Sequence, residues 1–306
     1  MRIVFFGSPE FAVASLSAVA DHHDLVAVVT QPDRPAGRGA KVQPPAVKVL
    51  ATSLGVPVLQ PSKLRDGVVA KELASLSPDV FVVVAYGRIL PPDLLAVPRL
   101  GPWNVHASIL PKFRGAAPIQ WAVIRGESET GVAIMRMEEG LDTGPVAALA
   151  REPILDSDTA GTLAMRLAPL GARLLVETLP RIAAGGISLA AQDHGAATLA
   201  PLLTKAHGQL DFRQPAAVVS AQARGVDPWP GATIFLNGEP AKVFQPMTLD
   251  GHGQPGEVLG LKSPGLAIAC GTGAIAFSEI QLPGRKRMPV KALLAGHPIP
   301  PGTLLL

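Results

Sequence analysis

The sequence predicts an α/β protein in two parts, a parallel-sheet domain followed by a small β-barrel or sandwich. Over the first thirty or so residues a strand-like run, a helix-like run and a second strand-like run follow one another, the order that builds parallel sheets. Beyond about residue 230 the pattern changes to short alternating runs separated by Gly and Pro turns. With 306 residues, of which 48% are hydrophobic, the chain is long enough for about two such domains.

The N-terminal elements are a strand at Ile3–Phe6 and a second strand at Leu25–Thr30, with a helix between them. The turn Gly7-Ser8-Pro9 opens that helix, because proline is tolerated in a first turn, where its missing N–H is not needed. Only one glycine occupies this turn, and no G-x-G-x-x-G follows it. The fingerprint of dinucleotide binding is therefore missing, and neither NAD nor FAD is expected.

Residues 31–45 are rich in Pro and Gly and are expected to adopt neither helix nor strand. From Asp33 to Lys48 the chain carries four basic residues and one acid. Three of the four basic residues belong to the segment 31–45, namely Arg34, Arg38 and Lys41. Loops of this length are usually functional or disordered, and basic side chains on a glycine-bearing loop suit phosphate contact. A solvated surface loop is the alternative.

The rest of the N-terminal domain alternates between apolar strands and short helices. Helices are expected at 47–54, 71–76, 91–95, 118–125 and 162–181, and strands at 56–59, 80–85, 103–105 and 132–137. The last helix repeats leucine at three- and four-residue spacing, and two glycines end it. We therefore place this domain at residues 1–190, a linker of little periodicity at 191–207 and a C-terminal domain at 208–306.

Five short strands are expected in the C-terminal domain, at 233–236, 241–244, 256–259, 266–270 and 274–277. Residues 205–306 hold nine basic residues against six acids, and Arg285-Lys286-Arg287 is the densest basic run. A small basic β-barrel is a common platform for nucleic acids. A run of three charges is also common on a face that contacts only solvent, so both interpretations stand at this point.

The candidate catalytic residues are Asn104 and His106, near the end of the strand around 103–105, and Asp142, in a Gly-Leu-Asp-Thr-Gly turn about one βα unit later. Residues two apart on a strand face the same side, which places the amide beside the imidazole. An amide offers donors and an acceptor, histidine titrates near neutral pH, and a carboxylate can orient the imidazole or a water. The simpler alternative is that Asn104 and Asp142 form turns and that His106 is a partly buried histidine.

Several classes of protein are excluded by composition. No apolar run is long enough for a transmembrane helix, and the segment Met1–Gly7 is interpreted as a first strand, not a signal peptide. The single cysteine, Cys270, rules out an intramolecular disulfide and fits a reducing cytoplasm. No ligand cluster has the spacing of a metal site.

Motifs of one known family run in order along the whole chain. They are Phe6-Gly-Ser-Pro-Glu-Phe11, the segment from Thr30 to Gly39, Asn104-Val-His106 with Ser108-Ile-Leu-Pro111, Arg114-Gly-Ala-Ala-Pro118, Gly140-Leu-Asp142-Thr-Gly144, Ala200-Pro-Leu-Leu-Thr-Lys205 and Asp227-Pro-Trp-Pro230. In this order and spacing they resemble the formyltransferases that use 10-formyltetrahydrofolate. The chain as a whole is similar to the members that act on methionyl initiator tRNA.

The resemblance implies a Rossmann-like first domain, an OB-like second domain and 10-formyltetrahydrofolate as the formyl donor, with no metal. It implies catalytic roles for Asn104, His106 and Asp142, and folate contacts for Ser108, Ile109, Leu110 and Pro111. Methionyl initiator tRNA would be the acceptor, and we expect a cytoplasmic monomer that does not bind a membrane. The tRNA-binding residues that it implies are Arg34, Arg38, Lys41, Lys205, Arg285, Lys286 and Arg287.

Three other functions remain open from the sequence. A sugar-nucleotide formyltransferase would share the first domain and the three catalytic residues, but it would need neither the basic loop nor the basic barrel. A formyltetrahydrofolate hydrolase would use water in place of the amine. A noncatalytic RNA-binding protein is the third, and the intact Asn104, His106 and Asp142 argue against it.

Overall fold

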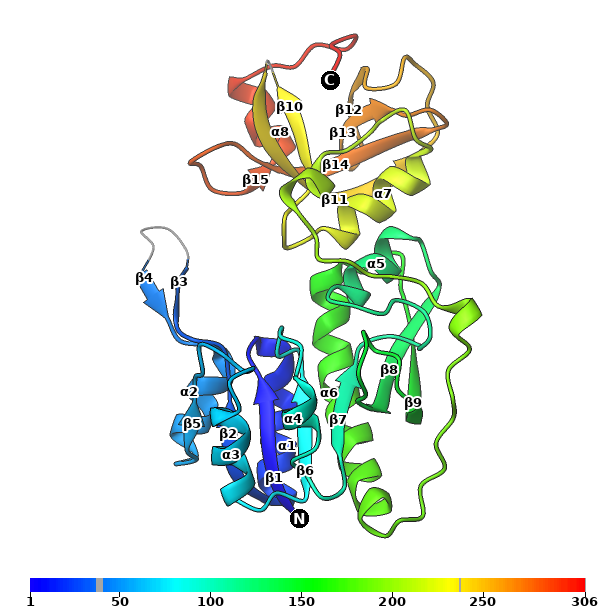
Figure 1. Ribbon diagram of the computed structural model, residues 1–306. Coiled ribbons are helices and arrows are strands. Elements are labelled where there is room, and N and C mark those ends of the chain that lie inside the picture. Colours follow the sequence, from blue (N-terminus) through cyan, green and yellow to red (C-terminus); the bar gives the residue numbers. More distant parts are fainter. Residues whose placement is uncertain (37–40, 237, 306) are drawn as a thin grey trace. The chain divides into compact units, whose positions relative to one another are not determined.

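The computed structural model describes residues 1–36, 41–236 and 238–305, and it is shown in Figure 1. The chain divides into two compact units. The larger unit comprises Met1–Pro118, Thr130–Pro153 and Ala164–Pro201, and the smaller one comprises Ile119–Glu129, Ile154–Leu163 and the chain from Leu202 onward. The boundaries at 190 and 207 that the sequence suggests stay a prediction.

A seven-stranded sheet forms the centre of the larger unit, in the order β5-β2-β1-β6-β7-β8-β9. Its first five strands are parallel, whereas β8 runs antiparallel to β7. The predicted parallel sheet is thus confirmed for five strands, and the sheet as a whole is mixed. The strands are β1 (Arg2–Gly7), β2 (Asp24–Val29), β5 (Val58–Leu59), β6 (Val80–Val84), β7 (Pro102–His106), β8 (Glu129–Arg136) and β9 (Val146–Pro153).

Helices cover this sheet, because strands that are apolar along their whole length must be shielded from water on both faces. Every residue of β6 is buried, as expected of a parallel strand with both faces covered. Gly171 in α6 allows close packing, because a Cβ there would lie 2.9 Å from Val105 Cγ1 of β7. The helices are α1 (Val13–His22), preceded by a 3₁₀ turn at Glu10–Ala12, and α2 (Ala46–Ser53), α3 (Val68–Ser75), α4 (Pro92–Leu95) and α6 (Ala160–Ala183).

The prediction that residues 31–45 form neither helix nor strand is wrong. Strands β3 (Arg34–Ala36) and β4 (Lys41–Gln43) pair antiparallel as a separate hairpin (Figure 1). Pro35 fits there because β3 pairs along only one edge, and a proline whose nitrogen faces the open edge loses no ladder hydrogen bond. At the base of the hairpin the Asp33 carboxylate accepts hydrogen bonds from Lys48 Nζ at 2.7 Å and from Gln60 Nε2 at 2.7 Å. Arg38 lies outside the described residues.

The smaller unit is built on a curled antiparallel sheet, consistent with the predicted small barrel-like domain. Its main path is β10-β11-β14-β13-β12, and β15 pairs with β14. The strands are β10 (Thr233–Leu236), β11 (Glu239–Leu249), β12 (Val258–Lys262), β13 (Gly265–Ala269), β14 (Ala274–Gln281) and β15 (Met288–Pro289), and the helices are α5 (Pro118–Ile124), α7 (Ala216–Gly225) and α8 (Val290–Gly296). Among the residues that the structure describes, no helix is long and apolar enough to cross a membrane.

Cys270 follows β13 and is buried, with 4% of its surface exposed. Burial raises the pKa of its thiol to about 11, and the thiolate is the reactive form. We expect iodoacetamide at pH 8 to leave Cys270 unmodified in the folded protein and to modify it fully in urea, as measured by intact mass. Rapid labelling of the folded protein would show that this end of β13 opens readily.

Candidate active site

The centre of the site is His106, the last residue of β7, whose side chain is buried. Its Nε2 lies 2.9 Å from the Phe113 carbonyl oxygen, and its Nδ1 lies 3.6 Å from Asp142 Oδ2. Because a carbonyl can only accept, Nε2 carries the proton of the neutral ring and Nδ1 carries the lone pair. The nitrogen with the lone pair therefore faces the Asp142 carboxylate.

Asp142 reaches the imidazole from the loop between β8 and β9, which we call the Asp142 loop (residues 137–145). Its carboxylate Oδ2 accepts a hydrogen bond from the Gly115 backbone N–H at 2.8 Å. The backbone of Asp142 has a φ of 51°, a left-handed conformation that non-glycine residues rarely adopt. The structure thus brings together Asp142 and His106, as the sequence predicts.

Asn104 lies on β7 two residues before His106 and is half-buried. Its Oδ1 is buried, and it has no hydrogen-bond partner within the described ranges. Buried side-chain oxygens are normally hydrogen-bonded, so an orphan one calls for an explanation. Rotating the amide by 180° would place its NH₂ group where Oδ1 now lies. Asn104 can therefore form a further hydrogen bond at this position, either as an acceptor or as a donor.

The residues expected to contact folate, 108–111, form the loop that follows β7. Ser108 is fully buried and its hydroxyl donates to the Lys112 carbonyl at 2.6 Å. Leu110 packs in a small apolar cluster with Ala133 and Met135 of β8, while Ile109 and Pro111 are half-buried. The hydrogen bond of Ser108 and the apolar packing of Leu110 hold the loop in this conformation. The contact of the loop with folate stays a prediction.

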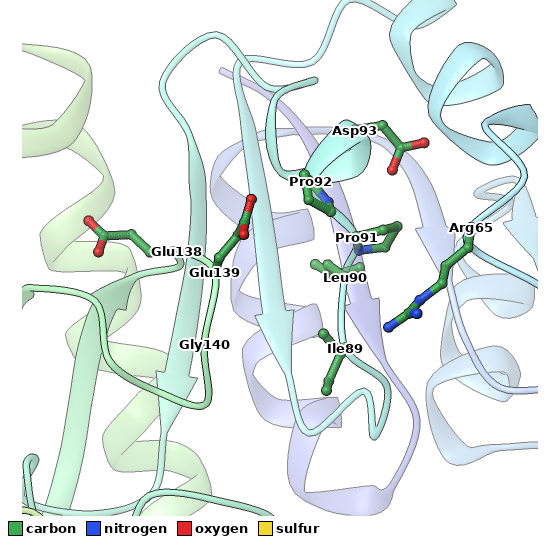
Figure 2. Close-up of a pocket in the computed structure, with 9 residues that line it drawn as sticks. All are labelled: Arg65, Ile89, Leu90, Pro91, Pro92, Asp93, Glu138, Glu139 and Gly140. Atoms are coloured by element: carbon green, nitrogen blue, oxygen red, sulfur yellow. The ribbon is translucent and has the colours of Figure 1, made fainter.

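A cavity of about 580 Å³ lies in the larger unit, where the sequence patterns indicated none. Figure 2 shows Glu138 and Glu139 on one side of it and Arg65 and Asp93 on the other, with Ile89 between them. The first two residues belong to the Asp142 loop. Two features of the sequence could have indicated this cavity: the acidic pair directly before Gly140, and the two prolines at the start of α4. The lining residues are Arg65, Ile89, Leu90, Pro91, Pro92, Asp93, Glu138, Glu139 and Gly140.

The predicted tRNA-binding residues lie on separate elements of the two units. Arg34 is exposed on β3, and Lys41 belongs to β4. Lys205 is exposed at the start of the 3₁₀ turn Lys205–Gly208. In the loop between β14 and β15, Arg285 and Lys286 are exposed.

Arg287, in the same loop, has two side-chain contacts within its own domain. Its guanidinium forms an ion pair with Glu279 and lies 4.0 Å from the centre of the Phe244 ring. The positive charge of Arg287 is therefore partly balanced by Glu279 of the same domain. In the described part of the chain, no group of three or more His, Cys, Asp or Glu side chains is arranged to hold a metal ion.

Comparison with known proteins covers both units. The formyl transferase family profile matches residues 1–179, and the profile of the formyl transferase C-terminal domain matches residues 202–298. A methionyl-tRNA formyltransferase of Myxococcus xanthus is 49% identical over 302 residues, which are 99% of this chain and 97% of that protein. Another, from Citrifermentans bemidjiense, is 47% identical over 306 residues, covering 100% of this chain and 96% of that one.

Solved structures with a similar fold are more distant in sequence. An N-formyltransferase from Helicobacter canadensis, in complex with folinic acid and dTDP-3-aminofucose, has a TM-score of 0.70 at 19% identity and covers 90% of this chain and 99% of that chain. HypX from Aquifex aeolicus, in complex with tetrahydrofolic acid, has a TM-score of 0.64 at 18% identity and covers 96% of this chain and 47% of that chain. At such low identity these two show the shared fold alone.

Proposed function

This chain belongs to the formyl transferase family, and we infer from that membership that it transfers the formyl group of 10-formyltetrahydrofolate to the free α-amine of methionyl initiator tRNA. One observation carries this conclusion. The identity with methionyl-tRNA formyltransferases extends over 99% of the chain, so it includes the C-terminal domain as well as the site. The product serves translation initiation.

The reaction joins the amine nitrogen to the formyl carbon and breaks the bond from that carbon to N10 of the folate. One proton leaves the amine and one is delivered to N10, so the two substrates exchange a formyl group for a hydrogen. The intermediate is tetrahedral and carries a negative oxygen. Stabilising such an oxygen with positioned donors is usually the largest contribution to catalysis.

We assign the roles from the contacts around His106. The Asn104 amide donates to the negative oxygen, and protonated His106 is a second donor. Nδ1 of His106 takes the proton of the attacking amine and returns it to N10, as a general base that then acts as a general acid. Asp142, 3.6 Å away, stabilises the imidazolium between these two steps.

The cavity beside the Asp142 loop is the place that we propose for the ring system of the folate. Its volume of about 580 Å³ lies within the range of about 300–1,000 Å³ of small-molecule sites. The aminopyrimidine edge of a pterin presents N–H donors, which the carboxylates of Glu138, Glu139 or Asp93 can accept. Because Glu138 and Glu139 are part of the Asp142 loop, a ring bound there would direct N10 toward the catalytic residues.

For the tRNA we propose contacts from the β3–β4 hairpin, from Lys205 and from the run Arg285-Lys286-Arg287. Lysine and arginine side chains supply phosphate contacts that position an RNA without reading its sequence. We also propose that the protein acts as a cytoplasmic monomer. In support of the reducing compartment, the single cysteine is buried and free.

Charge reversal at Arg38 tests the tRNA contact that we propose for the basic segment from Arg34 to Lys41. We expect Arg38→Glu to raise KM for methionyl initiator tRNA by about 10-fold or more, because a phosphate contact becomes a repulsion, while the Kd for folate stays unchanged. Arg181→Glu is the matched control, since Arg181 is an exposed residue in the last turn of α6 and the change in net charge is the same. Equal losses for tRNA and folate would contradict a role confined to tRNA.

The function itself is tested by an acceptor panel with the unmodified protein and 10-formyltetrahydrofolate. Methionyl initiator tRNA is compared with methionyl elongator tRNA, uncharged initiator tRNA, a 4-amino sugar nucleotide and no acceptor. Transfer confined to the charged initiator is expected. Transfer to the sugar, or formate release without an acceptor, would contradict methionyl initiator tRNA as the acceptor. The roles proposed for the three catalytic residues would still stand.

A further inference from the structure

The segment from Ala190 to Ala200, most of which falls in the linker that the sequence predicts at 191–207, lies against the loops of the site. We call it the strap. At one end Ala190 exchanges two backbone hydrogen bonds with Val146, both 2.9 Å long. At the other end Thr198 and Ala200 form backbone hydrogen bonds of 2.9 and 2.8 Å with Arg114. The strap therefore spans the distance between the Asp142 loop and the loop after β7, and all of it belongs to the larger unit.

The two residues whose oxygens lie opposite the His106 ring nitrogens both have an uncommon backbone. Phe113, whose carbonyl meets Nε2, has a φ of 60°, and Asp142, whose carboxylate faces Nδ1, has a φ of 51°. Non-glycine residues pay free energy to adopt this left-handed conformation, and they keep it only where the surroundings hold it in place. The position of the imidazole thus depends on what holds these two residues.

The strap supplies a side-chain contact to each of them. Nε2 of Gln192 donates to the Asp142 carbonyl at 2.9 Å and to the Gly144 carbonyl at 2.6 Å. Oγ1 of Thr198 accepts from the Phe113 backbone N–H at 2.9 Å. Each left-handed residue beside His106 is therefore held by one polar side chain of the strap.

Gln192 also connects the two loops to each other. Its Oε1 accepts from Nε and Nη2 of Arg114 at 3.1 and 2.7 Å, and Arg114 is buried, with 6% of its surface exposed. One amide thus donates to the Asp142 loop and accepts from the loop after β7. A glutamate would keep the contact to Arg114 but could not donate to the two carbonyls.

We propose that the strap is part of the active site, and that Gln192 and Thr198 are positioning residues that set the two contacts of His106. This inference rests on the proposed function for its kinetic test. Neither side chain needs to touch a substrate. Both act through Asp142 and Phe113, so their loss should reduce the rate of the chemical step more than the binding of either substrate.

The kinetic test compares Gln192→Ala and Gln192→Glu with Leu199→Ala. Leu199 is on the strap, but its side chain is 70% exposed, so its truncation leaves the strap's backbone contacts in place. Because misplacing a catalytic group by about 1 Å can cost about 100-fold in rate, we expect both Gln192 variants to lower kcat by about 10- to 100-fold, with KM for both substrates within about threefold. Leu199→Ala should match the unmodified protein.

Thr198 allows a rescue experiment. Thr198→Val removes the acceptor with little change in shape and should lower kcat by about 10-fold, whereas Thr198→Ser keeps the hydroxyl and should restore it. An equal loss for valine and serine would contradict the assigned contact. Thermal unfolding of every variant separates a general loss of stability from a loss of positioning.

A double-mutant cycle decides whether Gln192 acts through Asp142. If it does, Gln192→Ala should cost little further activity in an Asp142→Ala background, because coupled residues are not additive. Losses that multiply, or a Gln192→Ala protein as active as Leu199→Ala, would overturn the inference.

Nitrogen chemical shifts of the labelled His106 ring give a readout that does not depend on activity. They should change in Gln192→Ala and not in Leu199→Ala. An unmodified protein without formyl transfer would overturn the proposed function instead, and the ring shifts would still test the strap.

Discussion

His106→Ala is expected to lower kcat/KM for formyl transfer by about 10³-fold, the largest effect of any single change considered, because proton transfer by a positioned side chain contributes about 10²–10⁴-fold. The variant loses the nitrogen that moves the proton from the amine to N10 and one donor to the negative oxygen. The buried imidazole is also replaced by a methyl group beside Phe113 and Asp142. Initial rates at varied tRNA and folate concentrations measure the loss.

The control for His106 is His252→Ala, because His252 is exposed in a loop of the other unit. It should retain full activity. Folding of the His106 variant is checked by thermal unfolding and by the Kd for tetrahydrofolate, which should change little because the proposed ring cavity does not include His106. A loss of less than about 10-fold would contradict a role in proton transfer.

Asn104→Ala is expected to reduce kcat by about 10²–10³-fold, the usual effect of removing one donor from an oxyanion site. KM for either substrate should change little, since the charge that Asn104 stabilises develops only in the transition state. The reason to choose Asn104 is its half-buried amide on β7, with an oxygen that finds no partner in residues 1–36, 41–236 and 238–305.

Asn104→Asp is the sharper variant for the same question. Aspartate has nearly the same shape as asparagine, but its ionised carboxylate can only accept hydrogen bonds. If the amide donates to the negative oxygen, the aspartate variant should be at least as impaired as the alanine variant. Substantial activity in Asn104→Asp would show that Asn104 acts as an acceptor or only as a spacer.

Local patterns predicted most of the elements and the candidate catalytic residues. The continuous apolar run of β6 and the alternation at residues 241–244 of β11 predicted those strands, because the burial of a strand is encoded in its own neighbouring residues. For the same reason, the separation of two residues between Asn104 and His106 correctly predicted that both lie on one strand. The composition of residues 31–45 led to the wrong prediction of a segment without strands. Counts of Pro and Gly do not reveal that Pro35 can occupy the open edge of a two-stranded hairpin.

The sequence by itself thus predicted most of the strands and helices and, through its motifs, the family and three candidate catalytic residues. Only the tertiary structure decided how Asp142 reaches His106, since β8 runs antiparallel to β7 and the Asp142 loop folds back. It also decided the cavity and the strap. The contacts concerned join residues 27, 50 and 85 positions apart, namely Gly115 with Asp142, Gln192 with Asp142, and Thr198 with Phe113. Periodicity describes only neighbours along the chain, so contacts between distant loops form no pattern that a single sequence displays.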